Sequence, residues 1–158
     1  MNGTSILVTG ADGYLGRQLI ARLANARAAG TVSTIVATDV RLTPPALQRP
    51  GVTYLQADIR DGGLADILRS HCIDTVVHLA SIVTPGKKSN RAFEYSVDVE
   101  GTRNVLEACV KVGVRQVIVS SSGAAYGYHA DNPAWLTEQD PVRGNEEFAY
   151  SWHKRLVE

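Results

Sequence analysis

The chain has 158 residues, of which 44% are hydrophobic, and this is the size and composition of one compact domain with a single core. Sixteen basic residues balance sixteen acidic residues, so net charge would not draw the chain to nucleic acid or to an anionic membrane surface. The N-terminus lacks a signal-peptide pattern, and no apolar stretch reaches transmembrane length. We therefore expect a cytoplasmic protein whose partners are small molecules or protein, with no nucleic acid and no membrane.

Apolar, β-branched runs alternate along the chain with segments of helical periodicity. The strands are expected at residues 5–9, 34–38, 52–56, 75–79 and 116–120. The helices are expected at residues 14–29, 63–71 and 91–112, where Gly113 ends the third, and in a last segment that opens near Phe148. This alternation predicts an α/β fold, a Rossmann-like, doubly wound parallel sheet that helices cover on both faces.

A glycine-rich turn lies directly between the first expected strand and the first expected helix. Its spacing is G-x-x-G-x-x-G, from Gly10 through Gly13 to Gly16. A dinucleotide pyrophosphate needs backbone N–H groups at a helix N-terminus, with glycines that allow a tight turn, close approach of the backbone and close helix packing. Taken alone the pattern is also that of an ordinary turn, but its position favours cofactor binding. The cofactor-binding residues expected here are Gly10, Gly13, Tyr14, Leu15 and Gly16.

Asp39 stands at the end of the second strand, 23 residues beyond Gly16. A carboxylate at about this separation accepts hydrogen bonds from the hydroxyls of the adenosine ribose. It favours NAD over NADP, because the 2′-phosphate of NADP would place a dianion beside the carboxylate. Arg41 would soften that repulsion, so NADP remains an alternative, as does an ordinary loop aspartate for Asp39 itself.

Two further strand ends carry residues expected to line the same site. Asp58 and Ile59 follow the third strand, and Leu79, Ala80 and Ser81 complete and follow the fourth. In open parallel sheets, ligands bind at the carboxyl ends of the strands. All five residues are therefore expected to contact the cofactor.

Six motifs follow one another along the chain: TGADGYLG, ADIRD, VVHLAS, VEGTRNVLEA, VSSSGAAYG and YSWHK. In order and interval they resemble the extended short-chain dehydrogenase/reductases, the NAD-dependent epimerase/dehydratase family, and the likeness extends from Ser5 to Glu158. The resemblance implies a doubly wound cofactor domain and a nucleotide-linked sugar, or a similar alcohol, as the small-molecule substrate.

Tyr150 and Lys154 are four residues apart and share one face of the last expected helix. A free phenol has a pKa of about 10, so a tyrosine that acts as a base near neutrality needs a cation close by, and a lysine one turn away supplies it. The resemblance adds that the lysine ammonium binds the nicotinamide ribose, so both residues are expected in the catalytic and in the cofactor-binding set. The alternative is a surface aromatic side chain beside a solvated charge.

Three serines end the fifth strand and lead into the next turn. The resemblance makes Ser122 the catalytic hydroxyl that orients the substrate, and it places Ser120 nearer the nicotinamide, among the cofactor-binding residues. In the implied reaction, Tyr150 removes a proton from a substrate hydroxyl while a hydride passes to NAD. Epimerases then return the hydride to the opposite face, dehydratases eliminate water, and plain dehydrogenases release the ketone.

Two other functions share these residues. One is a dinucleotide-binding or redox-sensing module without catalysis, against which the intact serine, tyrosine and lysine argue. The other is a reductase or dehydrogenase for a steroid-like or small alcohol substrate, which the sequence does not separate from an epimerase or a dehydratase. No metal site is expected, because the four histidines show no metal-ligand spacing.

Two departures from the family pattern bear on these expectations. Asp98 replaces the usual asparagine of the N-V-x-G-T stretch. If it faces the cleft, an ionised acid there cannot donate a hydrogen bond, and one interpretation is that it pairs with Lys154. Family members also continue for roughly as many residues again. We therefore expect residues 1–158 to form an NAD(P)-binding domain that is incomplete at its C-terminus and lacks the substrate domain, with weak NAD binding and inefficient turnover. A homodimer is in doubt, because half of the usual interface would be missing.

Overall fold

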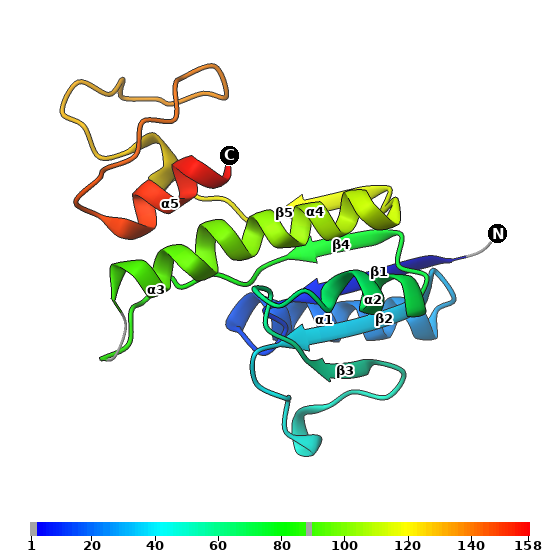
Figure 1. Ribbon diagram of the computed structural model, residues 1–158. Helices are drawn as coiled ribbons and strands as arrows, with labels where there is room; N and C mark the ends of the chain where they lie inside the picture. The colour runs from blue at the N-terminus through cyan, green and yellow to red at the C-terminus, as the bar shows by residue number, and fades with distance from the viewer. Residues whose placement is uncertain (1–2, 88–89) are drawn as a thin grey trace.

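A five-stranded parallel sheet forms the centre of the molecule (Figure 1). The structure is a computed structural model and describes residues 3–87 and 90–158. The strands are β1 (Thr4–Thr9), β2 (Val32–Asp39), β3 (Thr53–Gln56), β4 (Thr75–His78) and β5 (Gln116–Val119). Their order is β3-β2-β1-β4-β5, so the first strand is central and β3 and β5 are the edges. This arrangement confirms the doubly wound α/β sheet, and the boundaries differ from the expected ones by one or two residues.

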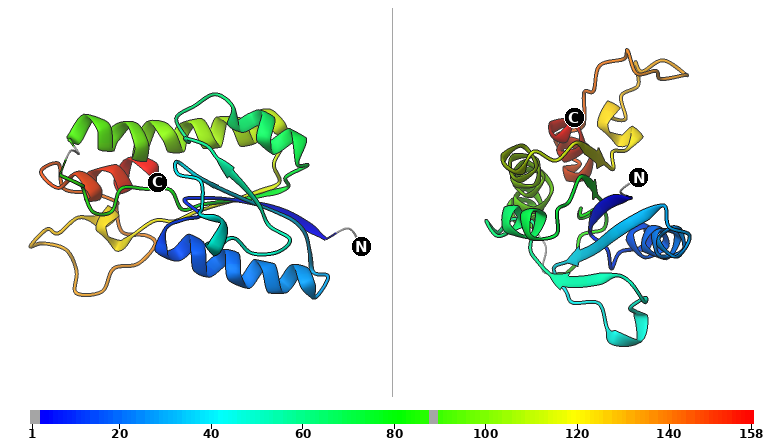
Figure 2. Two further views of the ribbon diagram at one scale, coloured as in Figure 1. Left: turned by 90° about the horizontal axis from the view of Figure 1, so that it is seen from below. Right: turned by 90° about the vertical axis from the view of Figure 1, so that its right-hand side faces the viewer.

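Helices cover both faces of the sheet (Figure 2). Helix α1 (Tyr14–Ala28) lies on one face, and α2 (Leu64–Ser70) and α4 (Thr102–Val112) lie together on the other. Helix α4 ends at Gly113, whose φ of 82° is the left-handed conformation that favours glycine at a helix C-terminus. In the described residues, no helix combines the length and the apolar character needed to cross a membrane.

Two apolar layers hold the helices to the sheet, because successive strand residues point to opposite faces. The layer under α2 and α4 includes Leu7, Val36, Leu68, Val76 and Val105. The layer under α1 includes Ile6, Val8, Ile20, Ile35 and Ala37. All ten of these side chains are less than a tenth exposed, so burial on both faces fixes the register of the central strands.

The long helix predicted at residues 91–112 is continuous but not uniform. It consists of α3 (Arg91–Tyr95), a wider π-helical turn (Ser96–Gly101) and α4. Gly101 lies against Ile59, and a Cβ atom at Gly101 would be 2.7 Å from the Ile59 Cδ1 atom. The missing side chain therefore lets the helix approach the end of β3. The wide π-helical turn directs Asp98 towards the interior, where it is 3% exposed.

The last part of the chain lies beside the long helix rather than under the sheet (Figure 1). After β5 the chain forms a short 3-10 turn (Gly123–Tyr126) and a long loop, then helix α5 (Ala149–Val157). Helix α5 packs against the 3-10 turn, α3 and the π-helical turn. Its start at Ala149 agrees with the helix expected near Phe148.

Candidate functional site

The glycine-rich turn follows β1 and leads into α1, as expected. Gly10 has a φ of +65°, and a Cβ atom there would be 2.7 Å from the backbone nitrogen of Ala80. A Cβ atom at Gly16 would overlap the carbonyl oxygen of Gly10 and the backbone of Ala11. Only glycine fits at these two positions, so the turn brings β1, the end of β4 and the start of α1 into direct backbone contact.

Helix α1 opens at this turn without a side-chain cap. Gly13 is the N-cap residue, and its own N–H donates to the carbonyl of Gly10 at 3.1 Å. The first N–H groups of a helix have no partner within the helix, and they carry its partial positive charge. Tyr14 and Leu15, the first two residues of α1, are 82% and 60% exposed. The turn therefore presents backbone donors that no side-chain cap satisfies.

Asp39 is held next to the turn by two backbone groups. Its Oδ2 atom accepts from the N–H of Asp12 at 3.0 Å, and its Oδ1 atom accepts from the N–H of Arg41 at 3.3 Å. Asp12 in turn pairs with Arg17 at 2.9 Å. These contacts fix the carboxylate at the carboxyl end of β2, where the sequence predicted a ribose acceptor.

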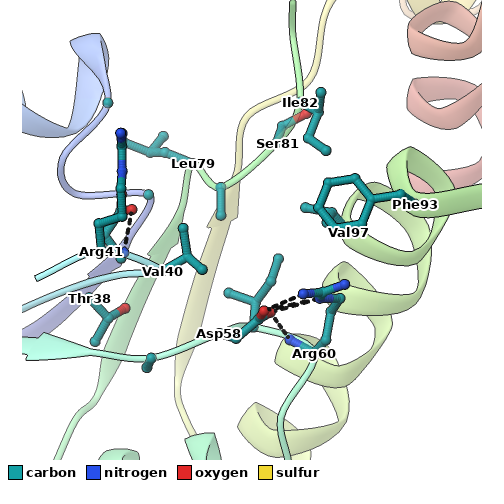
Figure 3. A pocket seen from close by; sticks show the side chains of 16 residues that line it. Thr38, Val40, Arg41, Asp58, Arg60, Leu79, Ser81, Ile82, Phe93 and Val97 are labelled. Atoms are coloured by element: carbon teal, nitrogen blue, oxygen red, sulfur yellow. Dashed lines mark hydrogen bonds and ion pairs between the residues drawn. The ribbon is translucent and has the colours of Figure 1, made fainter. Parts of the chain in front are cut away.

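A cavity of about 380 Å³ lies at the carboxyl ends of β1, β2, β3 and β4 (Figure 3). Eight of the residues predicted to bind a cofactor line it: Gly10, Gly13, Asp39, Asp58, Ile59, Leu79, Ala80 and Ser81. Four separate strand ends therefore meet at one hollow, as the rule for ligand sites in open parallel sheets requires.

The prediction missed the wall of this cavity formed by α3 and the residues near it. Arg60 forms a bidentate ion pair with Asp58, with Nη2 2.5 Å from Oδ2, and its guanidinium lies 5.1 Å from the ring centroid of Phe93 (Figure 3). The hydrogen bonds from Arg60 lower the pKa of the Asp58 carboxyl. Phe93 and Val97, four residues apart on the helix, both face the cavity, and this helical spacing was the signal in the sequence.

The Tyr150–Lys154 pair lies on α5, outside this cavity. The Lys154 ammonium is 5.6 Å from the centroid of the Tyr150 ring and donates to the carbonyl of Ser120 at 2.8 Å. Lys154 is 6% exposed, and burial lowers its pKa, while the charge of Asp98 acts in the opposite direction. The helix therefore brings a buried cation to the phenol and ties it to the end of β5.

The Ser122 side chain caps the 3-10 turn that follows it. Its Oγ atom accepts from the N–H of Ala124 at 3.2 Å and so caps the 3-10 turn. The neighbouring Ser121 hydroxyl is hydrogen-bonded to the carboxylate of Glu158. Within the described part of the chain, no hydrogen bond joins Ser122 to Tyr150, and Ser120 contributes only its carbonyl to Lys154.

A model of the NAD dependent epimerase/dehydratase family matches residues 6–158. The chain belongs to this family. The UDP-glucose 4-epimerase of Klebsiella pneumoniae is 30% identical over 127 residues, which are 77% of this chain and 91% of that protein. An uncharacterised protein of Mycobacterium tuberculosis is 32% identical over 141 residues, which cover 87% of this chain but only 37% of the relative.

Solved structures of family relatives share the fold. MoeE5, solved in complex with UDP-glucose and NAD, is 31% identical with a TM-score of 0.74 over 97% of this chain and 46% of its own. DesIV, a dTDP-glucose 4,6-dehydratase from Streptomyces venezuelae solved with NAD, is 26% identical with a TM-score of 0.81 over 98% of this chain and 49% of its own. The chain thus spans about half the length of these structural relatives.

His78, in the VVHLAS motif of this family member, forms a buried hydrogen-bonded chain. Its Nδ1 atom lies 2.6 Å from the Thr9 hydroxyl, and its Nε2 atom lies 2.9 Å from the Thr102 hydroxyl. The Thr102 hydroxyl donates to the carbonyl of Asp98, so it accepts from Nε2–H, and the neutral ring then accepts from Thr9 at Nδ1. Burial lowers the pKa of His78 to about 4.

The expectation that Asp98 pairs with Lys154 is wrong. The Oδ2 atom of Asp98 lies 2.9 Å from Nδ1 of His153, whereas Lys154 donates to the carbonyl of Ser120. The wide π-helical turn directs the carboxylate towards the residue that precedes the lysine on α5. In residues 3–87 and 90–158, no group of three or more histidine, cysteine, aspartate or glutamate residues is arranged to hold a metal ion.

Proposed function

We propose that residues 1–158 are the NAD-binding and proton-transferring part of an epimerase/dehydratase-type oxidoreductase whose substrate is a nucleotide sugar. The observation that carries the proposal is the backbone cradle at Gly10 and Gly16, where a Cβ atom has no room, beside the fixed carboxylate of Asp39. MoeE5 and DesIV, whose structures contain NAD, are the relatives that support it.

The residues of the cavity suit a dinucleotide. The turn from Gly10 to Gly16 would hold the pyrophosphate with the backbone N–H groups at the start of α1. Asp39 would accept from the adenosine ribose, and Asp58, Ile59, Leu79, Ala80 and Ser81 would contact the rest of the nucleoside. NAD is favoured over NADP, because Asp39 already carries a negative charge at the position where a 2′-phosphate would lie.

Tyr150 would remove the proton of the substrate hydroxyl at its Oη atom. NAD, when bound, supplies the hydride acceptor that the oxidation of an alcohol requires. Lys154, whose buried ammonium lies 5.6 Å from the centroid of the Tyr150 ring, would be the cation beside this phenol. Ser122, after release of its cap contact to Ala124, would hydrogen-bond the same substrate oxygen.

Isothermal titration of the chain with NAD and with NADP tests the cofactor part of the proposal. We expect NAD to bind more tightly than NADP, and Asp39→Ala to weaken NAD at least about tenfold, since a hydrogen-bonded charge contributes about 1.5–3 kcal/mol. Asp66→Ala is the matched control, because that side chain is 83% exposed on α2. Equal and unmeasurable binding of both cofactors would refute the proposal.

Turnover separates the enzyme from its second candidate, a dinucleotide-binding module without catalysis. The cap contact of Ser122, which occupies the expected catalytic hydroxyl, is the observation that favours the second candidate. Nucleotide sugars, a steroid alcohol and a small secondary alcohol would each be incubated with NAD. The signal followed would be conversion of the substrate by chromatography together with the absorbance of reduced nicotinamide, because an epimerase returns the hydride. We expect a signal with a nucleotide sugar that Tyr150→Phe abolishes; an undiminished signal in that variant removes Tyr150 from the mechanism.

A further inference from the structure

Asp98 and His153 form a buried contact between the π-helical turn and α5. They are 55 positions apart in sequence, and their side chains are 3% and 1% exposed. A buried carboxylate is costly unless donors surround it. The contact is therefore one that the surrounding structure must stabilise.

Three donors surround the Asp98 carboxylate. Its Oδ1 atom accepts from the Ser81 hydroxyl at 3.0 Å and from the N–H of Ile82 at 2.8 Å, and Oδ2 faces Nδ1 of His153 at 2.9 Å. Such a set suits the ionised acid, which has only acceptor atoms. It follows that the proton on His153 lies at Nδ1.

The other ring nitrogen of His153 has no such partner. Among the described residues, Nε2 is buried and makes no hydrogen bond, and the ring of Tyr95 lies edge-on to the imidazole with centroids 5.7 Å apart. Among the described residues, the contact with Asp98 is therefore the one hydrogen bond that orients the His153 ring.

We propose that Asp98 and His153 are a positioning pair that couples the wall of the cofactor cavity to the helix that carries Tyr150 and Lys154. This inference rests on the proposed function. Ser81 and Ile82, which anchor Asp98, line the cavity (Figure 3).

On the other side of the pair, His153 directly precedes Lys154, whose Nζ atom reaches the carbonyl of Ser120. A shift of α5 by one hydrogen-bond length would break that contact. The pair acts through Lys154, because among the described residues neither Asp98 nor His153 lines the cavity itself.

The pair also sets the charge around Lys154. Asp98 is hydrogen-bonded to His153, the residue that precedes Lys154. Burial lowers the pKa of Lys154, and the negative charges of Asp98 and Glu158 act in the opposite direction. Asp98→Asn keeps the volume of the side chain and removes the charge, but it also replaces one acceptor by a donor. His153→Leu removes the contact and leaves the charge of Asp98 in place. The two contributions, position and charge, can therefore be separated by substitution.

Titration of NAD into α5 variants tests the positional role. We expect His153→Leu to weaken NAD binding about tenfold, which corresponds to about 1.4 kcal/mol. His153→Asn, whose amide can donate from the place of Nδ1, should restore affinity to within about threefold of the native chain. Leu156→Asn, on the outer face of α5, is the control. A folded His153→Leu chain with native NAD affinity overturns the proposal.

Measurements without cofactor keep the proposal testable if His153→Leu does not fold or if the native chain binds no NAD. Long-range proton–nitrogen NMR correlations should show the Nδ1–H tautomer at His153, and an Nε2–H tautomer would overturn the pair. Asp98→Asn should lower the pH at which the Lys154 side chain titrates, and an unchanged midpoint overturns the charge role. Failure of the native chain to bind NAD, with these two results as expected, refutes the proposed function and leaves the Asp98–His153 contact and its effect on Lys154 established.

Discussion

The edge of the sheet at the predicted cofactor site (Gly10, Gly16 and Asp39), called the cofactor edge below, and helix α5 are held in different ways. At the edge, Gly10 and Gly16 bring backbones together with no side chain between them. On α5 the buried face is polar, since Ser151, His153 and Lys154 are each less than a tenth exposed, while Leu156 on the same helix is 42% exposed. One region is fixed by steric fit and apolar packing, the other by hydrogen bonds and buried charges.

This difference predicts which changes destabilise each region. A close-packed backbone tolerates no added atom. A buried polar face loses its partners one at a time, and each unpaired group costs free energy. Four substitutions, taken from the largest expected effect to the smallest, test this contrast.

Gly16→Ala should have the largest effect. The new Cβ atom would overlap the carbonyl of Gly10, which is backbone and cannot move aside, so we expect a loss of at least about 3 kcal/mol in the free energy of unfolding. Urea denaturation measures it. Gly62→Ala is the control, because nothing lies within 4 Å of a Cβ atom there. Similar losses in both variants would show that the edge is not sterically fixed.

His78 should make stability depend on pH. The pKa of His78 is about 4 in the folded chain and 6.5 in the unfolded chain, so the unfolded chain binds the proton first as pH falls. Stability from this residue is complete above pH 6.5 and is lost towards pH 4, by about 3 kcal/mol. Denaturation across this range should show a steeper fall for the native chain than for His78→Gln. Parallel curves would contradict the prediction.

Ser151→Ala should cost less, about 2 kcal/mol. The Ser151 hydroxyl donates to the carbonyl of Ala124 at 2.7 Å and accepts from the N–H of Asn145 at 2.9 Å, and both groups would lose their partner. The control is Ser70→Ala, whose exposed hydroxyl contacts only the carbonyl of Ile67. Equal unfolding midpoints for the two variants would mean that α5 does not depend on its polar face.

Trp135→Ser should have the smallest effect. This side chain is 89% exposed in the loop before α5, so its removal should change the free energy of unfolding by less than about 0.5 kcal/mol. Thermal unfolding followed by circular dichroism measures the change. A larger loss would show that the loop packs more closely than its exposure indicates.

Sequence patterns predicted the cofactor edge better than the surroundings of α5, for a physical reason. The turn from Gly10 to Gly16 and the acid at Asp39 depend on a strand, a turn and a helix that follow one another in the chain. The wall at Arg60 and Phe93 and the pair of Asp98 with His153 depend instead on how a distant helix is rotated. No periodicity in the sequence indicates the π-helical turn that sets this rotation.

The position of β5 at the edge of the sheet has a consequence for residues 1–158 studied alone in concentrated solution. In the described residues, its outer side carries backbone N–H and C=O groups without a neighbouring strand, and Ile118 in its middle is 47% exposed. An unprotected edge of this kind is a template on which a second chain can add a strand, although four residues make it a short one. We expect light scattering to detect slow aggregation that Ile118→Lys suppresses, since a charge on an edge strand opposes intermolecular pairing.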